Sequence, residues 1–180
     1  MNFEFSLSEI DFLTYQLYNA SKKKSIKNQR RKSWILVTLA FLVLGISFYE
    51  YKKISAYLFF ACAILSLIIY PFYLKDYYRN HYLKYVRETL KNRYDQSVII
   101  KFESEHVELI DSNSETKINH AILEGIDEIE NYIFIRIKTG GGIIIPKKRI
   151  ERIEELKEEL NKIAVKYNLK TNLELDWKWK

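Results

Sequence analysis

Two uncharged apolar stretches lie in the first half of this chain, and they constrain its fold more than any other feature. Residues 33–49 form a run of 17 residues without a charged side chain, residues 54–74 form a run of 21, and only four residues separate the two. As α-helices they would be roughly 25 and 31 Å long, close to the thickness of a bilayer's hydrocarbon core, about 30 Å. We therefore predict a two-helix transmembrane hairpin with spans at 33–49 and 54–74.

Basic residues flank this hairpin on its outer sides. Seven Lys or Arg residues precede the first run, six follow the second, and only Lys52 and Lys53 lie in the loop between them. By the positive-inside rule, this distribution predicts that both termini are cytoplasmic. The same basic clusters disfavour a buried hairpin of a soluble protein, and the 32 residues before the first run disfavour a signal peptide.

The net charge of +6 and the isoelectric point of 9.2 conceal two unlike halves. Residues 1–96 hold 15 Lys/Arg and 7 Asp/Glu, a balance of +8, whereas residues 97–180 hold 14 and 16, a balance of −2. The positive charge is therefore membrane-proximal, which disfavours nucleic acid as a partner. The single cysteine, Cys62, cannot form an internal disulfide.

Residues 1–32 read as a short strand followed by an amphipathic helix. Apolar and polar residues alternate over residues 3–7, and Ser8 with Asp11 three residues later forms a weak capping box. We expect one face of this helix to be apolar and buried, with the residues Ile10, Leu13, Leu17 and Tyr18.

The exit from the second run is rich in tyrosine and includes Pro71, which suits a helix kink. Residues 75–96 have few helix breakers and are expected to form a juxtamembrane helix. Its tyrosines (Tyr77, Tyr78, Tyr82 and Tyr85) suit either interfacial anchoring or a nucleic-acid platform, and the adjacent bilayer favours anchoring.

From residue 97 onward the apolar residues recur at every second position, as in a β-strand, instead of at helical spacing. Five to six strands are expected, the strongest at 132–137, with turns short enough for an antiparallel arrangement. After Pro146 the period returns to that of a helix, with apolar residues at Ile150, Ile153, Leu156, Leu160, Ile163 and Tyr167. We expect residues 97–168 to be a cytoplasmic domain whose sheet is closed by this helix.

The tail, residues 169–180, alternates again through Leu173, Leu175, Trp177 and Trp179. An added strand is the favoured interpretation, ahead of an interfacial anchor and a frayed end. The sequence leaves open whether the strand at residues 3–7 joins the C-terminal sheet.

Motifs of catalysis or cofactor binding are weak. Gly140, Gly141 and Gly142 lead into a strand instead of a helix, which indicates a hairpin turn and not a phosphate loop. The three histidines (His81, His106 and His120) have no metal-ligand spacing and are expected at the surface or partly buried. We expect no enzyme activity, no cofactor, no metal site and no small-molecule substrate.

One basic cluster stands out in the soluble part, at the junction of the last strand and the helix: Lys147, Lys148, Arg149 and Arg152. These side chains suit contact with anionic lipid headgroups or with a partner. Ordinary solubilising charge is the favoured alternative, because acidic residues of the same helix offset them.

The order of parts resembles the YcxB-like family of small bacterial membrane proteins. The resemblance rests on residues 3–12, on the tight hairpin, on the strand at 98–102, and on Tyr132-Ile-Phe-Ile followed by Ile143-Ile-Ile-Pro-Lys-Lys-Arg-Ile150. It implies an α+β membrane protein with a C-terminal domain similar to the pleckstrin-homology fold, in which one helix closes a curved antiparallel sheet. It carries over no catalytic residues.

Together these observations predict a multi-pass protein of the bacterial inner (plasma) membrane. We expect a non-enzymatic, membrane-anchored binding or scaffolding module with a protein partner or self-association. The alternatives are anionic-lipid sensing at the membrane surface and a membrane immunity or stress-regulatory subunit.

Overall fold

The computed structural model describes residues 2–112 and 114–180, and the chain divides into two compact units. The first unit comprises the residues up to Tyr15 together with Tyr85–Lys178, and the second comprises Gln16–Lys84 with Trp179–Lys180. All strands of the described residues lie in the first unit, and the two apolar runs lie in the second.

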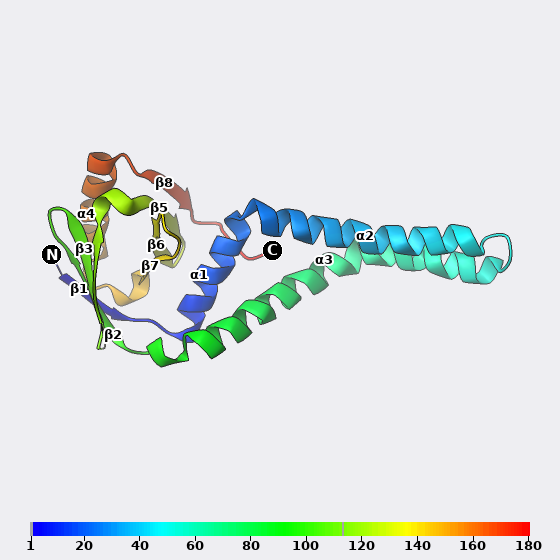
Figure 1. Ribbon diagram of the computed structural model, residues 1–180, viewed down its shortest axis with the longest axis horizontal. Helices are drawn as coiled ribbons and strands as arrows, with labels where there is room; N and C mark the ends of the chain where they lie inside the picture. The colour runs from blue at the N-terminus through cyan, green and yellow to red at the C-terminus, as the bar shows by residue number, and fades with distance from the viewer. Residues whose placement is uncertain (1, 113) are drawn as a thin grey trace. The chain divides into compact units, whose positions relative to one another are not determined.

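The second unit is built on two long antiparallel helices, α2 (Lys24–Phe48) and α3 (Lys53–Thr89), joined by a short loop (Figure 1). Both are long and apolar enough to cross a membrane. Both helices are longer than the predicted spans. The helix α2 begins at Lys24, within the basic cluster that precedes the first apolar run. The helix α3 continues through Pro71, so the expected juxtamembrane helix is the same helix as the second apolar run.

Small and hydroxylated side chains bring α2 and α3 together. A Cβ atom at Gly45 would lie 2.6 Å from the Phe60 ring, so a larger residue there would require the ring to move. The Thr38 and Ser66 hydroxyls are hydrogen-bonded at 2.9 Å. Small interfacial residues and hydroxyl pairs are typical of helix packing in lipid. Most of the remaining surface is uncovered, since only 11% and 17% of the apolar windows of α2 and α3 are buried.

The first unit contains two four-stranded sheets. In one sheet the order is β1 (Asn2–Ser6), β2 (Ser97–Phe102), β3 (His106–Ile110) and β4 (Glu115–Asn119), and all neighbours are antiparallel. The strand before the hairpin therefore joins the sheet that follows it, with Phe3 opposite Ile100 and Phe5 opposite Val98. The sheet alternates as its sequence predicts, because Phe3, Phe5 and Ile100 are buried.

The second sheet has the order β7 (Gly142–Pro146), β6 (Tyr132–Ile137), β5 (Leu123–Ile129) and β8 (Lys170–Glu174). Gly140 and Gly141 have φ values of +95° and +79°, so the predicted hairpin turn between β6 and β7 is confirmed. The favoured interpretation of the tail is confirmed for its first part, since β8 is a strand, whereas residues 175–180 are not in a strand. However, β8 pairs with β5 in parallel, because a helix carries the chain back between β7 and β8.

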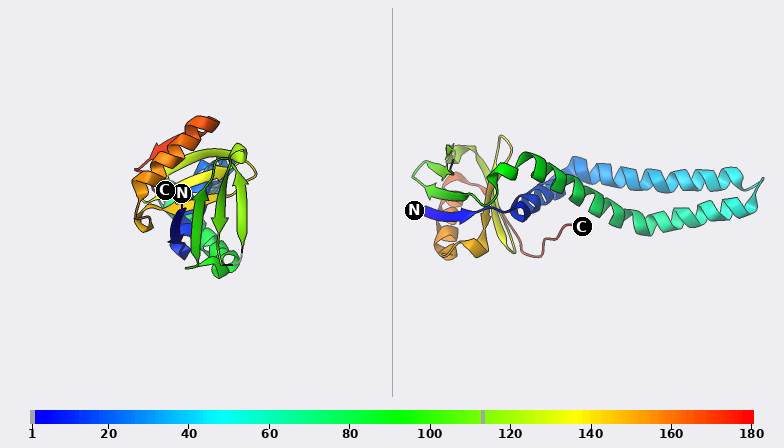
Figure 2. Two further views of the ribbon diagram at one scale, coloured as in Figure 1. Left: turned by 90° about the vertical axis from the view of Figure 1, so that its left-hand side faces the viewer. Right: turned by 90° about the horizontal axis from the view of Figure 1, so that it is seen from below.

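That helix, α4 (Ile153–Tyr167), packs its apolar face on β5 and on the short turn η2 (His120–Ile122) (Figure 2). Leu156, Leu160 and Ile163 are buried, as their spacing predicts. Ile150 is buried too, but it precedes the helix and follows the turn η3 (Lys147–Arg149). The helix ends at Asn168, whose φ of 50° is the left-handed conformation of a C-terminal cap.

Candidate functional site

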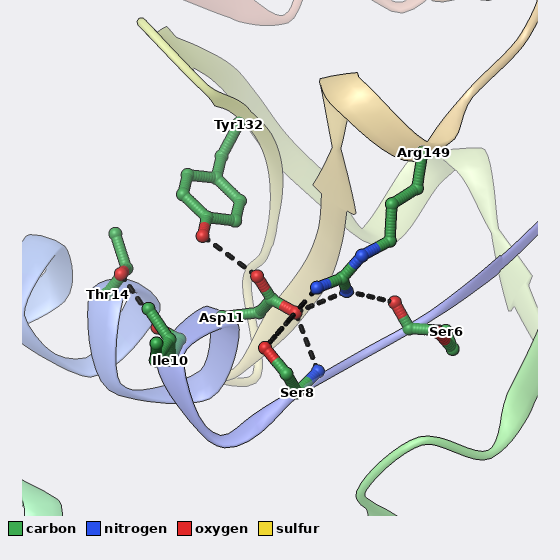
Figure 3. A network of polar contacts seen from close by, with 7 residues as sticks. All are labelled: Ser6, Ser8, Ile10, Asp11, Thr14, Tyr132 and Arg149. Atoms are coloured by element: carbon green, nitrogen blue, oxygen red, sulfur yellow. Dashed lines mark hydrogen bonds and ion pairs between the residues drawn. The ribbon is translucent and has the colours of Figure 1, made fainter.

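A buried carboxylate, Asp11, lies at the start of helix α1 (Glu9–Lys22) and is only 3% exposed. The Ser8 backbone N–H and hydroxyl donate to its Oδ2 at 2.6 and 2.8 Å (Figure 3). The bond from the backbone is the carboxylate half of a capping box, which confirms the predicted pair.

Two further donors reach Asp11 from parts of the chain far away in sequence. The Tyr132 hydroxyl on β6 donates to Oδ1 at 2.8 Å, and the Arg149 guanidinium on η3 forms an ion pair with Oδ2 (Figure 3). Arg149 also donates to the carbonyl oxygen of Ser6. These contacts join the segment that precedes the hairpin to the sheet and turn that follow it.

The electrostatics of this network favour an ionised Asp11. Burial raises the pKa of Asp11, but the bonds from Ser8, Tyr132 and Arg149 outweigh it and hold the pKa below its usual range. Burial, and then the hydrogen bond to Asp11, raises the pKa of Tyr132 to about 12. Tyr132 therefore remains a donor at physiological pH.

The network also corrects the predicted face of α1. Ile10 is 66% exposed, whereas the neighbouring Asp11, Phe12 and Leu13 are buried. The helix is turned so that Asp11 reaches Tyr132 and Arg149, and this orientation leaves Ile10 in solvent. Apolar periodicity missed this rotation because it treats a carboxylate as a surface group.

The basic cluster of the last strand–helix junction does not form one patch. Lys147 bonds Glu128 at 2.8 Å, and Arg152 pairs with Glu155 at 3.2 Å. Lys148 is exposed and has no ion pair within the described residues. With Arg149 held by Asp11, three of the four predicted contact residues are already engaged by acidic side chains.

An ion-pair row crosses the sheet that contains β4. Glu108 on β3 lies opposite Lys101 on β2 and Lys117 on β4, with N–O distances of 3.2 and 3.1 Å. Lys117 and Lys101 together lower the pKa of Glu108 to about 2. The row places alternating charge beside the outer edge of the sheet, a feature that discourages indiscriminate strand pairing.

A cavity of about 250 Å³ lies in the first unit. Its apolar wall comes from β1 and α1, β2, β3 and β7, and its rim is polar. The lining includes Phe5, Phe12, Val98, Leu109 and Ile143, with Arg93, Gln96, Asp111, Ser114 and Thr116 at polar positions. Thr116 is an exposed residue of β4, and within the described residues that strand pairs only with β3. An apolar hollow therefore lies beside an accessible strand edge.

His120 was expected at the surface or partly buried, but it is only 1% exposed and packs edge-on against Tyr167, with ring centroids 5.1 Å apart. Burial, followed by the charge of Lys166, lowers its pKa. Its burial follows from its position in the turn η2, beneath α4. In the described part of the chain, no three His, Cys, Asp or Glu residues are grouped so that they could hold a metal ion.

Comparison with protein families gives a match within the C-terminal half of the chain. The model of the YcxB-like protein family matches residues 102–164, which run from the end of β2 to the last turn of α4. No curated protein and no solved structure matches the chain. The match supports the resemblance indicated by the motifs: over residues 102–164 the chain is similar to the YcxB-like protein family.

Proposed function

We propose that this protein is a non-enzymatic binding module, anchored in the bacterial inner membrane by α2 and α3, with both termini cytoplasmic. The exposed apolar surface of the two helices supports insertion, because a soluble protein rarely leaves so large a continuous apolar surface in water. The Thr38–Ser66 hydrogen bond and the Gly45–Phe60 contact supply packing suited to lipid. The basic residues outside both runs support the orientation.

The soluble domain is proposed to be a pleckstrin-homology-like fold interrupted by the membrane hairpin. Antiparallel strands β1–β4 and β5–β7 in two sheets, with α4 after the last of them, support this assignment. The hairpin is inserted between β1 and β2, and the Asp11 network reinforces the join. In this arrangement the chain passes between the domain and the membrane anchor twice.

The bound partner is proposed to be an extended segment of another protein, added along β4. The observation that carries this proposal is the accessible β4 edge beside the cavity of about 250 Å³. Main-chain hydrogen bonds to an edge strand supply affinity, and a neighbouring pocket selects a side chain. This cavity has room for one apolar side chain, and its rim offers polar groups to the flanking backbone.

Site-specific photo-crosslinking in intact cells tests the proposal. A photo-reactive amino acid at Thr116 should capture one recurrent protein, whereas the same group at Val165, 76% exposed on α4, should not. Thr116→Trp should fill the cavity and reduce co-purification of that protein, and Val165→Trp serves as the matched control. Equal capture at both positions, or capture that Thr116→Trp leaves intact, would refute the binding mode.

Lipid recognition by Lys147, Lys148, Arg149 and Arg152 receives less support, because acidic partners neutralise all of them except Lys148. An anionic vesicle would have to replace those ion pairs before it gained new ones. A full-length protein with a membrane anchor floats with its bilayer whether or not these residues bind lipid, so flotation does not test this alternative. Crosslinking of Lys148 to anionic lipid does test it, and we expect that crosslinking to be weak.

A further inference from the structure

A second hollow lies within the helical unit, where the basic residues meet the apolar run. Its volume is about 300 Å³, and it lies between α2 and α3. Cationic side chains line one part and apolar side chains the other: Lys27, Arg30, Arg31, Trp34, Pro71 and Leu74. The cationic residues precede the first uncharged run, so the hollow spans the step from charge to hydrocarbon.

Among the described residues, the cations of this hollow have no acidic side chain as a partner. Within the described residues, no ion pair joins Lys27, Arg30 or Arg31 to a carboxylate side chain. This contrasts with the soluble cluster, where Lys147, Arg149 and Arg152 are all paired. Positive charge here is therefore available to an anion from outside the chain.

Aromatic rings and the chain's last residues hold Arg30 in place. Its guanidinium lies over the rings of Tyr78 and Trp179, 5.7 and 4.9 Å from their centroids, and donates to the carbonyl oxygen of Lys180 at 2.7 Å. The Trp179 indole N–H donates in turn to the backbone oxygen of Lys75 at 3.0 Å. A pre-positioned guanidinium binds phosphate with less loss of side-chain freedom than a mobile one.

Trp34 brings a further hydrogen-bond donor to this hollow. The indole N–H of Trp34 is buried and has no hydrogen-bond partner within the described residues. A buried N–H without an acceptor is energetically unfavourable. An oxygen-bearing ligand at this depth would relieve that cost after a small movement of the ring.

We propose that this hollow binds one anionic phospholipid of the cytoplasmic leaflet. The phosphate lies among Lys27, Arg30 and Arg31, and the glycerol and upper acyl chain lie along Trp34, Pro71 and Leu74. Basic pockets between membrane helices suit such headgroups. Free phosphate shares the anionic chemistry but has nothing to place on the apolar wall, which is why a lipid is the better occupant.

The Trp179–Lys180 tail competes with this lipid for Arg30. It supplies a main-chain oxygen to the guanidinium and covers it with an indole ring. A lipid phosphate that engages Arg30 fully displaces this oxygen. The tail should therefore lower lipid affinity, and its removal should raise it.

Native mass spectrometry of the full chain, released from nanodiscs, tests the lipid site. With phosphatidylglycerol we expect one retained lipid, and with phosphatidylcholine none. Each neutralised cation should lower affinity about fivefold, so Arg30→Gln with Arg31→Gln should lower it about 25-fold. Lys52→Gln with Lys53→Gln, in the loop at the opposite end of the hairpin, is the matched control and should change nothing. Trp179→Ala should increase retention.

Three results would overturn the proposal. These are equal retention in the Arg30/Arg31 variant and the control, equal retention of phosphatidylcholine, and displacement of the lipid by millimolar inorganic phosphate. Lys27→Gln keeps the test valid if the double variant does not insert, because Lys27 is exposed. The site lies in the helical unit and does not depend on peptide binding at β4, so a failure at one site leaves the other intact.

Discussion

Removal of one hydroxyl, in the variant Tyr132→Phe, is the sharpest test of the join between the two parts of the strand-bearing unit. Within the described residues, Asp11 accepts bonds from the Ser8 N–H, the Ser8 hydroxyl, Tyr132 and Arg149. The variant removes the neutral donor on Oδ1 and leaves the other three. A hydrogen bond to a charged group contributes about 1.5–3 kcal/mol. Because three donors remain, we expect a loss in the lower part of that range, about 1.5–2 kcal/mol.

The loss should depend on pH in a defined direction. The folded-state pKa of Asp11 lies below its ordinary value of 3.8, so its stabilisation is fully present above that value. It fades as the pH falls through the folded-state pKa, because a protonated Asp11 gains less from the Tyr132 hydroxyl. The difference between wild type and Tyr132→Phe should therefore be largest near neutral pH and shrink in acid.

Pulse proteolysis in urea, on the protein in detergent micelles, measures this difference as a shift in the free energy of unfolding of the strand-bearing unit. Tyr85→Phe is the matched control, since Tyr85 is 44% exposed and should change stability by less than about 0.5 kcal/mol. No loss in Tyr132→Phe, or a loss that is the same at neutral and acid pH, would refute the role assigned to the Asp11 network.

Other predictions address the hairpin, the added strand and the surface ion pairs. Leu42→Arg should reduce the membrane-inserted fraction, because an arginine near mid-span costs about 2.5–3.5 kcal/mol, and unchanged fractionation would contradict the first span. A periplasm-dependent reporter should be active only in the 50–53 loop, and activity at the C-terminus would reverse the orientation. Gly125→Val should detach β8, because a Cβ there lies 2.5 Å from the Lys170 carbonyl oxygen, and hydrogen exchange should show lost protection in β8 with β3 unchanged. Glu108, whose pKa is lowered from 4.5 to about 2, should stabilise the fold above pH 4.5 and lose that effect as the pH falls toward 2, a dependence that Glu108→Gln should remove from the acid-unfolding curve.

The candidate contact residues show where local reasoning reaches its limit. Lys147, Lys148, Arg149 and Arg152 are adjacent in sequence, and adjacency alone suggested a shared surface. The partners of Lys147, Arg149 and Arg152 come from β5, α1 and α4, so the structure distributes these three among separate ion pairs. Nothing near Arg149 in the sequence indicates Asp11, which lies on the other side of the hairpin.

The cavity beside the β4 edge also could not be predicted from sequence periodicity. Its wall combines residues from β1, α1, β2, β3 and β7, and each was predicted only as a member of its own strand or helix. The hollow between α2 and α3 is closer to the sequence prediction, since its cations belong to the basic cluster that precedes the first apolar run. Its pairing of Arg30 with Trp179 depends on the position of the tail, which the sequence left among three alternatives.

Local pattern by itself determined the two long apolar helices, the strand positions between residues 97 and 146, the glycine turn and the amphipathic helix α4. These features depend on side-chain period and on backbone preferences of neighbouring residues, which the chain carries within a few positions. Only the tertiary structure decided that β1 pairs with β2 across the hairpin, that β8 runs parallel to β5, and that Arg149 meets Asp11. Each of these residues has many possible partners elsewhere in the chain, and the sequence pattern does not distinguish among them. The partner is chosen by the arrangement that buries the apolar faces and also satisfies the buried charge.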